Sequence, residues 1–181
     1  MSKLKELTWE VHKNAERQAF VKEIFKGEVE PKRYAEFLFN QHAIYDILEA
    51  TAMMHGLFND MPTVRRAPNI MEDFNELWGN DEKPELKSST RKYMDHIFKI
   101  REDIDKVMAH VYVRHMGDLS GGQMLKKKVP GSGKLYQFDD DVQAIKEKIR
   151  SKCKDSMADE AKICFEYATE LFKEMNDSEV K

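Results

Sequence analysis

The chain has 181 residues, 35% of them charged and 41% hydrophobic, and its formal net charge is −3 at pH 7. This length suits a single domain over residues 1–181 with a sizeable core, and the weak negative charge gives no support for a nucleic-acid partner. Two cysteines, Cys153 and Cys164, exclude a disulfide scaffold. Without a long apolar run or a signal-peptide pattern, we expect a cytoplasmic protein that has no membrane anchor.

Apolar residues recur at every third or fourth position along most of the chain, which is the pattern of amphipathic helices. Leu4, Leu7, Val11 and Ala15 carry this pattern through the first segment, which we expect to be one helix. No convincing strand alternation occurs, so the predicted fold is all-α, with about seven helices around one core. Further helices are expected from Pro31 to about Phe58, then at about 67–78, 84–101, 103–128, 139–156 and 158–176, with loops at Gly79-Asn80-Asp81 and Pro130-Gly131-Ser132-Gly133.

Three of the eight glycines fall in the run Gly117-Asp118-Leu119-Ser120-Gly121-Gly122-Gln123, inside a predicted helix. Each glycine in a helix costs about 1 kcal/mol relative to alanine, so the run needs a reason. Gly117 and Gly121 share one helix face, Gly122 widens this bare stripe, and Asp118 lies within it. The pattern indicates a site where backbone approaches a flat object; a close helix crossing or a turn is the structural alternative.

The letters Leu119-Ser120-Gly121-Gly122-Gln123 also occur in the signature peptide of ABC-type ATPases. Such an ATPase needs a glycine-rich phosphate loop that follows a strand. The best candidate here, around Gly133 and Lys134, lacks the first glycine and the final Ser or Thr. The sequence therefore excludes this class of ATPase.

His12 is a candidate metal ligand in the first segment. In a continuous helix Lys5, His12 and Glu16 would line one face, with Lys5 roughly 10 Å from His12 along the axis. This separation suits an iron-ligating imidazole with a cation for a haem propionate, and Glu16 could accept the other ring N–H. Spacing alone does not select His12, because the chain has five other histidines: His42, His55, His96, His110 and His115.

Taken together, these motifs closely resemble haem oxygenases, and the resemblance extends in order along essentially the whole chain. The run from Gly117 to Gln123 preceded by Tyr112-x-Arg114, together with an N-terminal Val11-His12-x-x-Ala15-Glu16, is highly specific. The matching residues are Leu4-Lys5-Glu6, Glu10-Val11-His12, Ala15-Glu16, Phe20, Ile44-Tyr45, Tyr112, Arg114, Gly117 to Gln123, Leu125-Lys126-Lys127, Arg150-Ser151, Glu160-Ala161-Lys162, Phe165 and Leu171-Phe172.

The resemblance implies a single-domain helical bundle with haem b sandwiched between two helices, as both substrate and cofactor. The implied reaction uses O2 and external electrons to give biliverdin, with the IX-alpha isomer as the family default, together with CO and ferrous iron. His12 matches the iron ligand, Asp118 the acid that holds a distal water network, and Gly117, Gly121 and Gly122 the glycines against the haem face. The residues that match haem-binding positions are Lys5, Glu16, Tyr112, Arg114, Lys146, Arg150 and Phe165.

Two departures from the family pattern stand out. Trp9 replaces a basic residue that some members carry before the iron ligand, so that Lys13 could take over its propionate contact. The connection after Lys128 is short, and we expect no membrane-anchoring tail, which resembles the soluble bacterial, algal or phage type rather than the animal type.

No flavin or nicotinamide motif is present, so electrons are expected from a partner. Lysines after the glycine run and on the later helix could dock an acidic ferredoxin, or could simply be a solvated face. A downstream bilin reductase is a further possible partner, and a monomer is the default state. The lysines are Lys126, Lys127, Lys128, Lys134, Lys148, Lys152 and Lys154.

Two alternative functions stay open at this point. The first is a non-catalytic haem-binding or haem-storage protein on the same scaffold, against which Asp118 and the three glycines argue. The second is the related all-α fold of thiaminase-type enzymes, which calls for a nucleophilic cysteine or a carboxylate-rich pocket. Cys153 and Cys164 are interpreted as ordinary core or surface residues, and no Glu-x-x-His pair indicates a di-iron centre.

Overall fold

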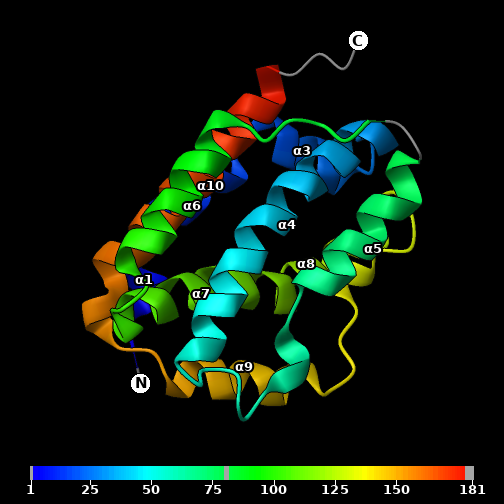
Figure 1. The fold of residues 1–181 in the computed structure, drawn as a ribbon. Helices are drawn as coiled ribbons and strands as arrows, with labels where there is room; N and C mark the ends of the chain where they lie inside the picture. Colours follow the sequence, from blue (N-terminus) through cyan, green and yellow to red (C-terminus); the bar gives the residue numbers. More distant parts are fainter. Residues whose placement is uncertain (1, 80–81, 178–181) are drawn as a thin grey trace.

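The computed structural model describes residues 2–79 and 82–177, and all regular structure in these ranges is helical (Figure 1). The predicted all-α class is therefore confirmed. The predicted loop residues Asn80 and Asp81 lie outside the described residues. The described α-helices are α1 (Leu4–Leu7), α2 (Trp9–Glu16), α3 (Ala19–Lys26), α4 (Pro31–Met54), α5 (Ala67–Trp78), α6 (Ser88–Ile100), α7 (Ile104–Leu119), α8 (Gly122–Leu125), α9 (Val142–Ser151) and α10 (Ala158–Asp177), with short 3₁₀ helices at Pro62–Val64, Lys134–Tyr136 and Asp155–Met157.

The first predicted helix is interrupted at Thr8, between α1 and α2. The Thr8 hydroxyl donates a hydrogen bond of 2.7 Å to the carbonyl of Leu4, a local bond that competes with regular helix geometry. The prediction of one continuous helix was therefore wrong here. Lys5 and His12 lie on two separate helices, so they do not share one face of a single straight helix as predicted.

The glycine run does not continue one long helix from 103 to 128, as the sequence pattern predicted. Instead α7 ends at Leu119 and the short α8 begins at Gly122, with Ser120 at φ −102° and ψ −88° between them. The turn interpretation of the glycines therefore applies at Ser120, and the site interpretation stays a prediction. α7 begins sharply, because the Asp103 side chain accepts a hydrogen bond of 3.1 Å from the backbone N–H of Lys106.

Other helix ends differ from the predicted ones for local reasons. α6 begins at Ser88 rather than near residue 84, because Lys87 is extended at φ −66° and ψ 153° and its N–H donates a hydrogen bond of 2.8 Å to Asn40 Oδ1. α9 begins at Val142 rather than residue 139, because Asp141 caps it by accepting a bond of 3.1 Å from the N–H of Ala144.

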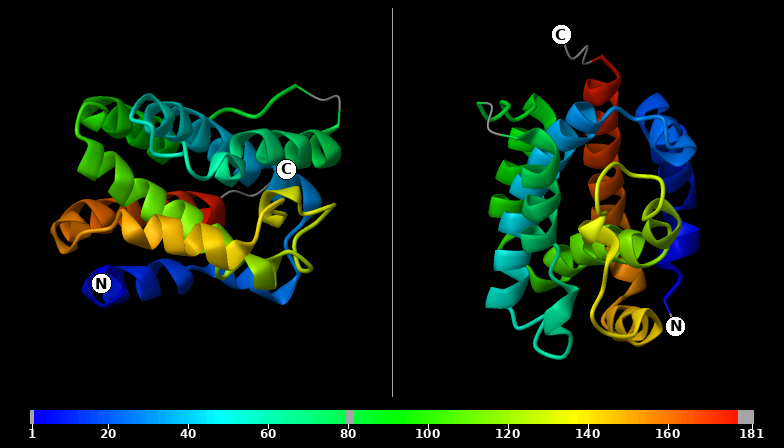
Figure 2. Two further views of the ribbon diagram at one scale, coloured as in Figure 1. Left: turned by 90° about the horizontal axis from the view of Figure 1, so that it is seen from below. Right: turned by 90° about the vertical axis from the view of Figure 1, so that its right-hand side faces the viewer.

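α10 is the element that brings the candidate site together. It packs against α7, α2, α3 and α6, while α4 packs mainly against α5, α6 and α7. In the right-hand view of Figure 2, α10 runs between the N-terminal helices and the pair formed by α4 and α5, and α7 crosses it. The helices that carry His12 and Asp118 are thus both held by α10.

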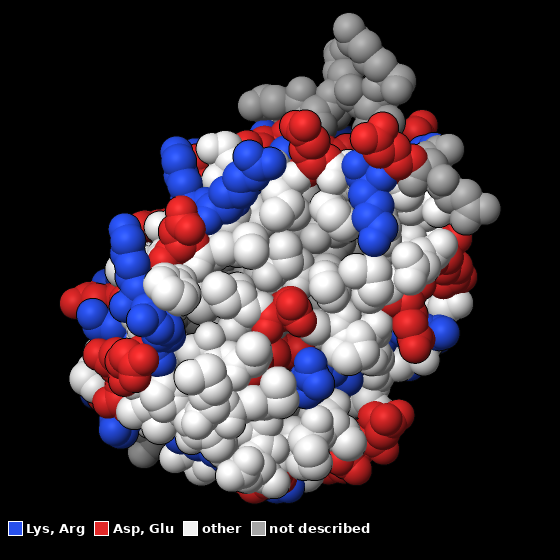
Figure 3. Space-filling view, in the orientation of Figure 1, with Lys and Arg blue, Asp and Glu red and all other residues white. Residues whose placement is uncertain are grey.

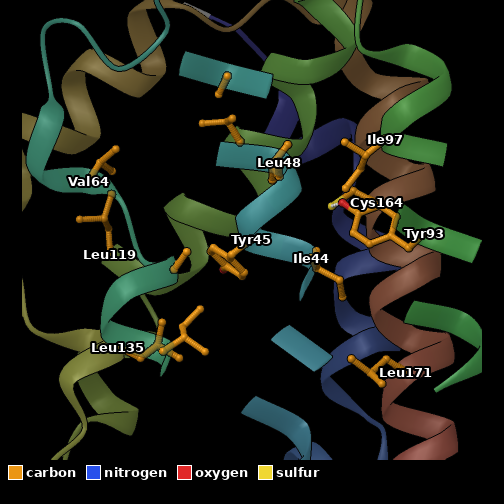
Figure 4. Close-up of a cluster of buried hydrophobic side chains, with 14 of the residues drawn as sticks. Ile44, Tyr45, Leu48, Val64, Tyr93, Ile97, Leu119, Leu135, Cys164 and Leu171 are labelled. Atoms are coloured by element: carbon orange, nitrogen blue, oxygen red, sulfur yellow. Dashed lines mark hydrogen bonds between the residues drawn. The ribbon is translucent and has the colours of Figure 1, made fainter. Parts of the chain in front are cut away.

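The core is apolar and continuous from α4 to α10. Figure 4 shows Tyr45 of α4 between a group around Leu119 and Leu135 and a group in which the Tyr93 ring lies beside Cys164. On the face in Figure 3, Lys and Arg side chains gather mainly along the edge where α6 lies, whereas the centre over α4 is mostly uncharged. Among the described residues, no helix combines the length and apolar character needed to cross a bilayer.

Candidate functional site

His12 lies on α2 with its imidazole 37% exposed. Its Nε2 lies 2.8 Å from Glu16 Oε1, one turn further along the helix, and Nδ1 has no hydrogen-bond partner among the described residues. The Phe165 ring of α10 stacks on the imidazole at 5.1 Å and 18°, and the Trp9 ring meets it edge-on at 5.8 Å. One ring nitrogen is thus oriented by a carboxylate and the other is free, which is the usual arrangement of a metal-ligating histidine.

Trp9 occupies a position where the sequence comparison above led us to look for a second basic residue near His12. The Lys13 ammonium lies 4.9 Å from the centre of the Trp9 ring, a cation–π distance. In this arrangement Lys13 packs on Trp9. If Lys13 takes the place of the missing basic residue and binds a propionate, it must first leave the Trp9 ring.

Asp118 is buried on α7 and faces α4. The Tyr45 hydroxyl donates a hydrogen bond of 2.7 Å to Oδ2 of Asp118. Burial raises the pKa of Asp118 to about 6, although His115, Tyr45 and two arginines act in the opposite direction. The carboxyl group can therefore hold or release a proton near neutral pH, a property that is frequent at functional sites.

Arg114 lies one turn before Asp118 and is buried behind it rather than exposed at the surface. Its Nη1 donates to Gln41 Oε1 at 3.1 Å, and its Nε lies 3.5 Å from the Tyr93 hydroxyl. Its Nη2 is buried without a hydrogen-bond partner among the described residues. Arg114 therefore lies in the protein interior, where it links α7 to α4 and α6.

The three glycines of the run have different surroundings. A Cβ atom added at Gly117 would meet nothing within 4 Å, and one added at Gly121 would meet only the Gly117 carbonyl at 3.9 Å. A Cβ added at Gly122 would lie 2.4 Å from the Tyr136 ring. Gly117 and Gly121 therefore leave open space beside the α7 backbone, whereas Gly122 is required by packing within the protein.

Four further candidates lie on α1, α7 and α9. Tyr112 of α7 is half-buried, and burial raises its pKa, while the positive charge of Arg150 on α9 acts to lower it. Lys146 and Arg150 are one turn apart on α9 and form no ion pair with the described residues. α9 packs on α7, so Tyr112 and Arg150 come together. Lys5 is exposed on α1, on the other side of the break at Thr8.

Sequence reasoning did not identify the polar contacts that α4 makes with α7. His115 Nε2 lies 2.8 Å from Glu49 Oε2, and the Glu49 carboxylate also accepts from the backbone N–H groups of Arg66 and Ala67 at 2.6 and 2.9 Å. Tyr45 and Glu49 are four residues apart and so share one face of α4. The sequence could therefore show that the two side chains lie on the same face of α4. It could not show that this face contacts α7, because that depends on how the helices pack.

Comparison with known proteins agrees with this geometry. A family model described as "Heme oxygenase" matches residues 1–174. Two algal proteins named heme oxygenase are similar: that of Porphyra purpurea is 30% identical, covering 99% of this chain and 88% of the relative, and that of Guillardia theta is 31% identical, covering 98% and 86%. Mouse heme oxygenase 2 is 30% identical, and the match covers 97% of this chain but only 65% of that longer protein.

Solved structures give the same result for the fold. Heme oxygenase-1 from Synechocystis in complex with heme superposes with a TM-score of 0.85 at 26% identity, covering 96% of this chain and 90% of that one. The heme oxygenase of Leptospira interrogans superposes with a TM-score of 0.84 at 29% identity, covering 94% and 97%. With its helical fold, its half-exposed histidine on α2 and its buried carboxyl on α7, the chain belongs to the heme oxygenase family.

Proposed function

We propose that this chain is a haem oxygenase that binds haem b between α2 and α7 and converts it, with O2 and external electrons, into biliverdin, CO and ferrous iron. The observation that carries the proposal is the open space beside Gly117 and Gly121, next to a buried carboxyl group with a pKa of about 6. The family match over residues 1–174 supports it. Bound haem would supply both the iron that activates O2 and the ring that is cleaved.

The α2 side of the site would bind the iron. His12 offers one imidazole nitrogen, and Glu16 holds the other at 2.8 Å, which fixes the orientation of the ring. In the present orientation Nδ1 is the nitrogen that is free to bind the iron, because Nε2 is held by Glu16. Phe165 stacks on His12 and limits how far the ring can tilt.

The α7 side would control a proton. Asp118 can carry a proton at its carboxyl group, and the Tyr45 hydroxyl holds this group in place through the 2.7 Å bond. In this proposal the Asp118 carboxyl group would hold ordered water and a proton on the α7 side of the site, while bound haem would supply the chemistry of O2 activation. Gly117 and Gly121 allow the α7 backbone to lie close to the haem face.

Regiochemistry would depend on cations at the haem edge. Lys146 and Arg150 on α9 present two positive charges one turn apart, suited to two propionates, with Tyr112 adjacent and Lys5 on the α1 side. Arg114 is buried, so its proposed role is to support Asp118 from behind rather than to bind a propionate. We propose biliverdin IX-alpha as the product.

Electrons would come from a ferredoxin-like donor. Lys126, Lys127 and Lys128 are exposed directly after the end of α8 and form no ion pair with the described residues. In contrast, Lys134, Lys152 and Lys154 pair with Glu72, Asp60 and Asp105, and the Lys148 ammonium bonds the Asp60 carbonyl. The proposed docking surface is therefore the three consecutive lysines, and turnover that does not change with ionic strength would contradict it.

The same proposal places the protein as a single-domain monomer in the cytoplasm, where its two cysteines, both free in the structure, would stay reduced. Biliverdin would then be available to a bilin reductase.

The test combines the protein with one equivalent of haemin, then adds ferredoxin, its reductase and NADPH in air. The proposal predicts loss of the Soret band with growth of a biliverdin band, and chromatography identifies the isomer. A Soret band that persists with both ferredoxin and a chemical reductant would make the chain a haem carrier. No Soret band at all would contradict haem binding.

A further inference from the structure

A second cluster of potential metal ligands lies away from His12, where α6, α7 and α10 meet. His96 comes from α6, His110 from α7 and Glu160 from the first turn of α10. The Nε2 atoms of the two histidines lie 2.5 Å and 2.8 Å from the same carboxylate oxygen, Glu160 Oε1. One ligand atom from each residue lies within 4.8 Å of the other two, so three helices converge on one point.

The surroundings hold these groups in a fixed orientation. His110 is fully buried, and its Nδ1 lies 2.6 Å from the Tyr93 hydroxyl, so its Nε2 is directed at the cluster. The imidazole of His96 packs against the Tyr167 ring at 5.5 Å. A hydrogen-bond partner on the far nitrogen of a histidine is the usual support of a metal ligand.

The three side chains differ in exposure, and the more exposed side of the cluster gives a metal ion a route to it. The His110 side chain is 0% exposed, that of Glu160 is 9% exposed and that of His96 is 20% exposed. His96, on α6, is the most exposed of the three side chains. An ion could therefore reach the cluster from the His96 side without opening the core.

The donor set favours a transition metal over a hard cation. Two imidazoles and one carboxylate form common sites for zinc and for non-haem ferrous iron, whereas calcium and magnesium prefer oxygen ligands alone. With metal–ligand bonds of about 2.1 Å, ligand atoms in a tetrahedral site lie roughly 3.4 Å apart. The present N···O separations would have to grow by less than about 1 Å, which the partly exposed His96 can accommodate.

We infer that His96, His110 and Glu160 form a binding site for one divalent transition-metal ion, zinc or ferrous iron, which ties α6, α7 and α10 together and is separate from the proposed haem site. The alternative is a metal-free triad in which both imidazoles donate hydrogen bonds to Glu160. The two accounts differ in whether the ion binds and stabilises the fold. Because neither His12 nor Asp118 takes part, the inference stands independently of the proposed haem chemistry.

The first experiment titrates the full chain, free of haem and treated with a chelator, with Zn²⁺ in competition with a chromophoric chelator, and with Fe²⁺ under anaerobic conditions. We expect one equivalent to bind, and we expect excess Zn²⁺, but not Mg²⁺, to raise Tm by about 5 °C. The metal bound more tightly identifies which of the two the site prefers. Binding of well under one equivalent of both metals would overturn the inference.

The second experiment compares His96→Ala and Glu160→Gln with His42→Ala, which removes a half-buried histidine from α4. We expect the first two variants to weaken metal binding at least tenfold, and His42→Ala to bind as the wild type does. Co²⁺ serves as a spectroscopic probe, and its visible bands should report a site of low coordination number that His96→Ala abolishes. Equal weakening by all three variants would assign the metal to scattered histidines and contradict the inference.

A third variant, His12→Ala, separates the two sites. We expect it to lose the spectrum of imidazole-ligated haem while retaining one equivalent of Zn²⁺. Zinc binding that disappears with His12 would place the ion at the His12–Glu16 pair and overturn the inference, whatever the outcome for haem. Failure of haem turnover with normal zinc binding would contradict only the proposed function.

Discussion

The two sides of the proposed haem site are built in different ways. On the α2 side, His12 is 37% exposed and is oriented by Glu16 from the same helix, with Phe165 as its main contact from another element. On the α7 side, Asp118 is buried and is held by Tyr45 of α4, with Arg114 connected to Tyr93 of α6 and Gln41 of α4. One side is local and adaptable, while the other depends on tertiary structure.

This difference assigns separate tasks to the two sides. A half-exposed ligand on a short helix can admit and release a flat substrate with little rearrangement. A buried network that several helices support can hold a proton and ordered water in one position during the reaction. We therefore expect the loss of His12 to act first on ligation of the iron, and the loss of Asp118 to act mainly on the course of the reaction.

The largest effect is expected from His12→Ala. Removing the imidazole should abolish the spectrum of imidazole-ligated haem and lower turnover by about 100-fold or more, because no other side chain of α2 is a comparable iron ligand. Added imidazole should restore the spectrum, since the cavity it fills opens to solvent. An unchanged spectrum in the variant would move the iron ligand to another histidine and contradict the assignment.

Gly117→Ala and Gly122→Ala form a matched pair on the α7 side. A Cβ at Gly117 has open space, so the variant should fold with at least wild-type stability, since alanine favours helix by about 1 kcal/mol, yet bind haem about tenfold more weakly. A Cβ at Gly122 meets Tyr136 at 2.4 Å, so this variant should lose about 1–3 kcal/mol of stability. Urea unfolding measures the stability of each variant, and haem titration measures its affinity. Equal changes in stability and affinity for the two variants would contradict the different roles of Gly117 and Gly122.

The pH dependence of stability tests the burial of Asp118. Its pKa is about 6 in the folded protein and 3.8 normally, so folding binds a proton between these values and the free energy of unfolding falls as pH rises through this window. At about 1.4 kcal/mol per pKa unit, the ionised Asp118 lowers the free energy of unfolding by on the order of 3 kcal/mol above pH 6. Asp118→Asn should therefore stabilise the haem-free protein at pH 7.5 but not below about pH 4.

Urea unfolding of wild type and Asp118→Asn across this range measures the difference directly. Asparagine keeps an oxygen that can accept the Tyr45 hydrogen bond, so the comparison isolates the ionised carboxylate. A difference in the free energy of unfolding that does not vary with pH would show that Asp118 titrates normally.

The smallest effect is expected from Glu16→Gln on the α2 side. Glu16 is 55% exposed, so its contact with His12 is largely screened, and we expect haem affinity to fall only a fewfold. The His12 imidazole should also donate slightly less electron density to the iron, and resonance Raman of the iron–imidazole stretch can detect this change. A loss of haem affinity as large as that of His12→Ala would show that iron binding depends on Glu16 as much as on His12.

The sequence predicted the helical class and the ends of α5 and α10 well, because apolar periodicity and Gly or Pro punctuation are local signals. It missed the breaks at Thr8 and Ser120, where a single side-chain bond or a run of glycines overrides periodicity. His12 and Asp118 stood out through resemblance to a family. The contacts of Glu49 did not, since they depend on which helix α4 packs against.

The most direct test of the account is the yield of biliverdin per haem consumed by Asp118→Ala, with wild type beside it. The variant keeps His12 and its contacts, so the account predicts normal haem binding and an unchanged imidazole-ligated spectrum. It also predicts that the biliverdin yield falls at least tenfold while haem is still reduced or degraded by other routes. A wild-type yield of biliverdin from Asp118→Ala would contradict the division of tasks between α2 and α7.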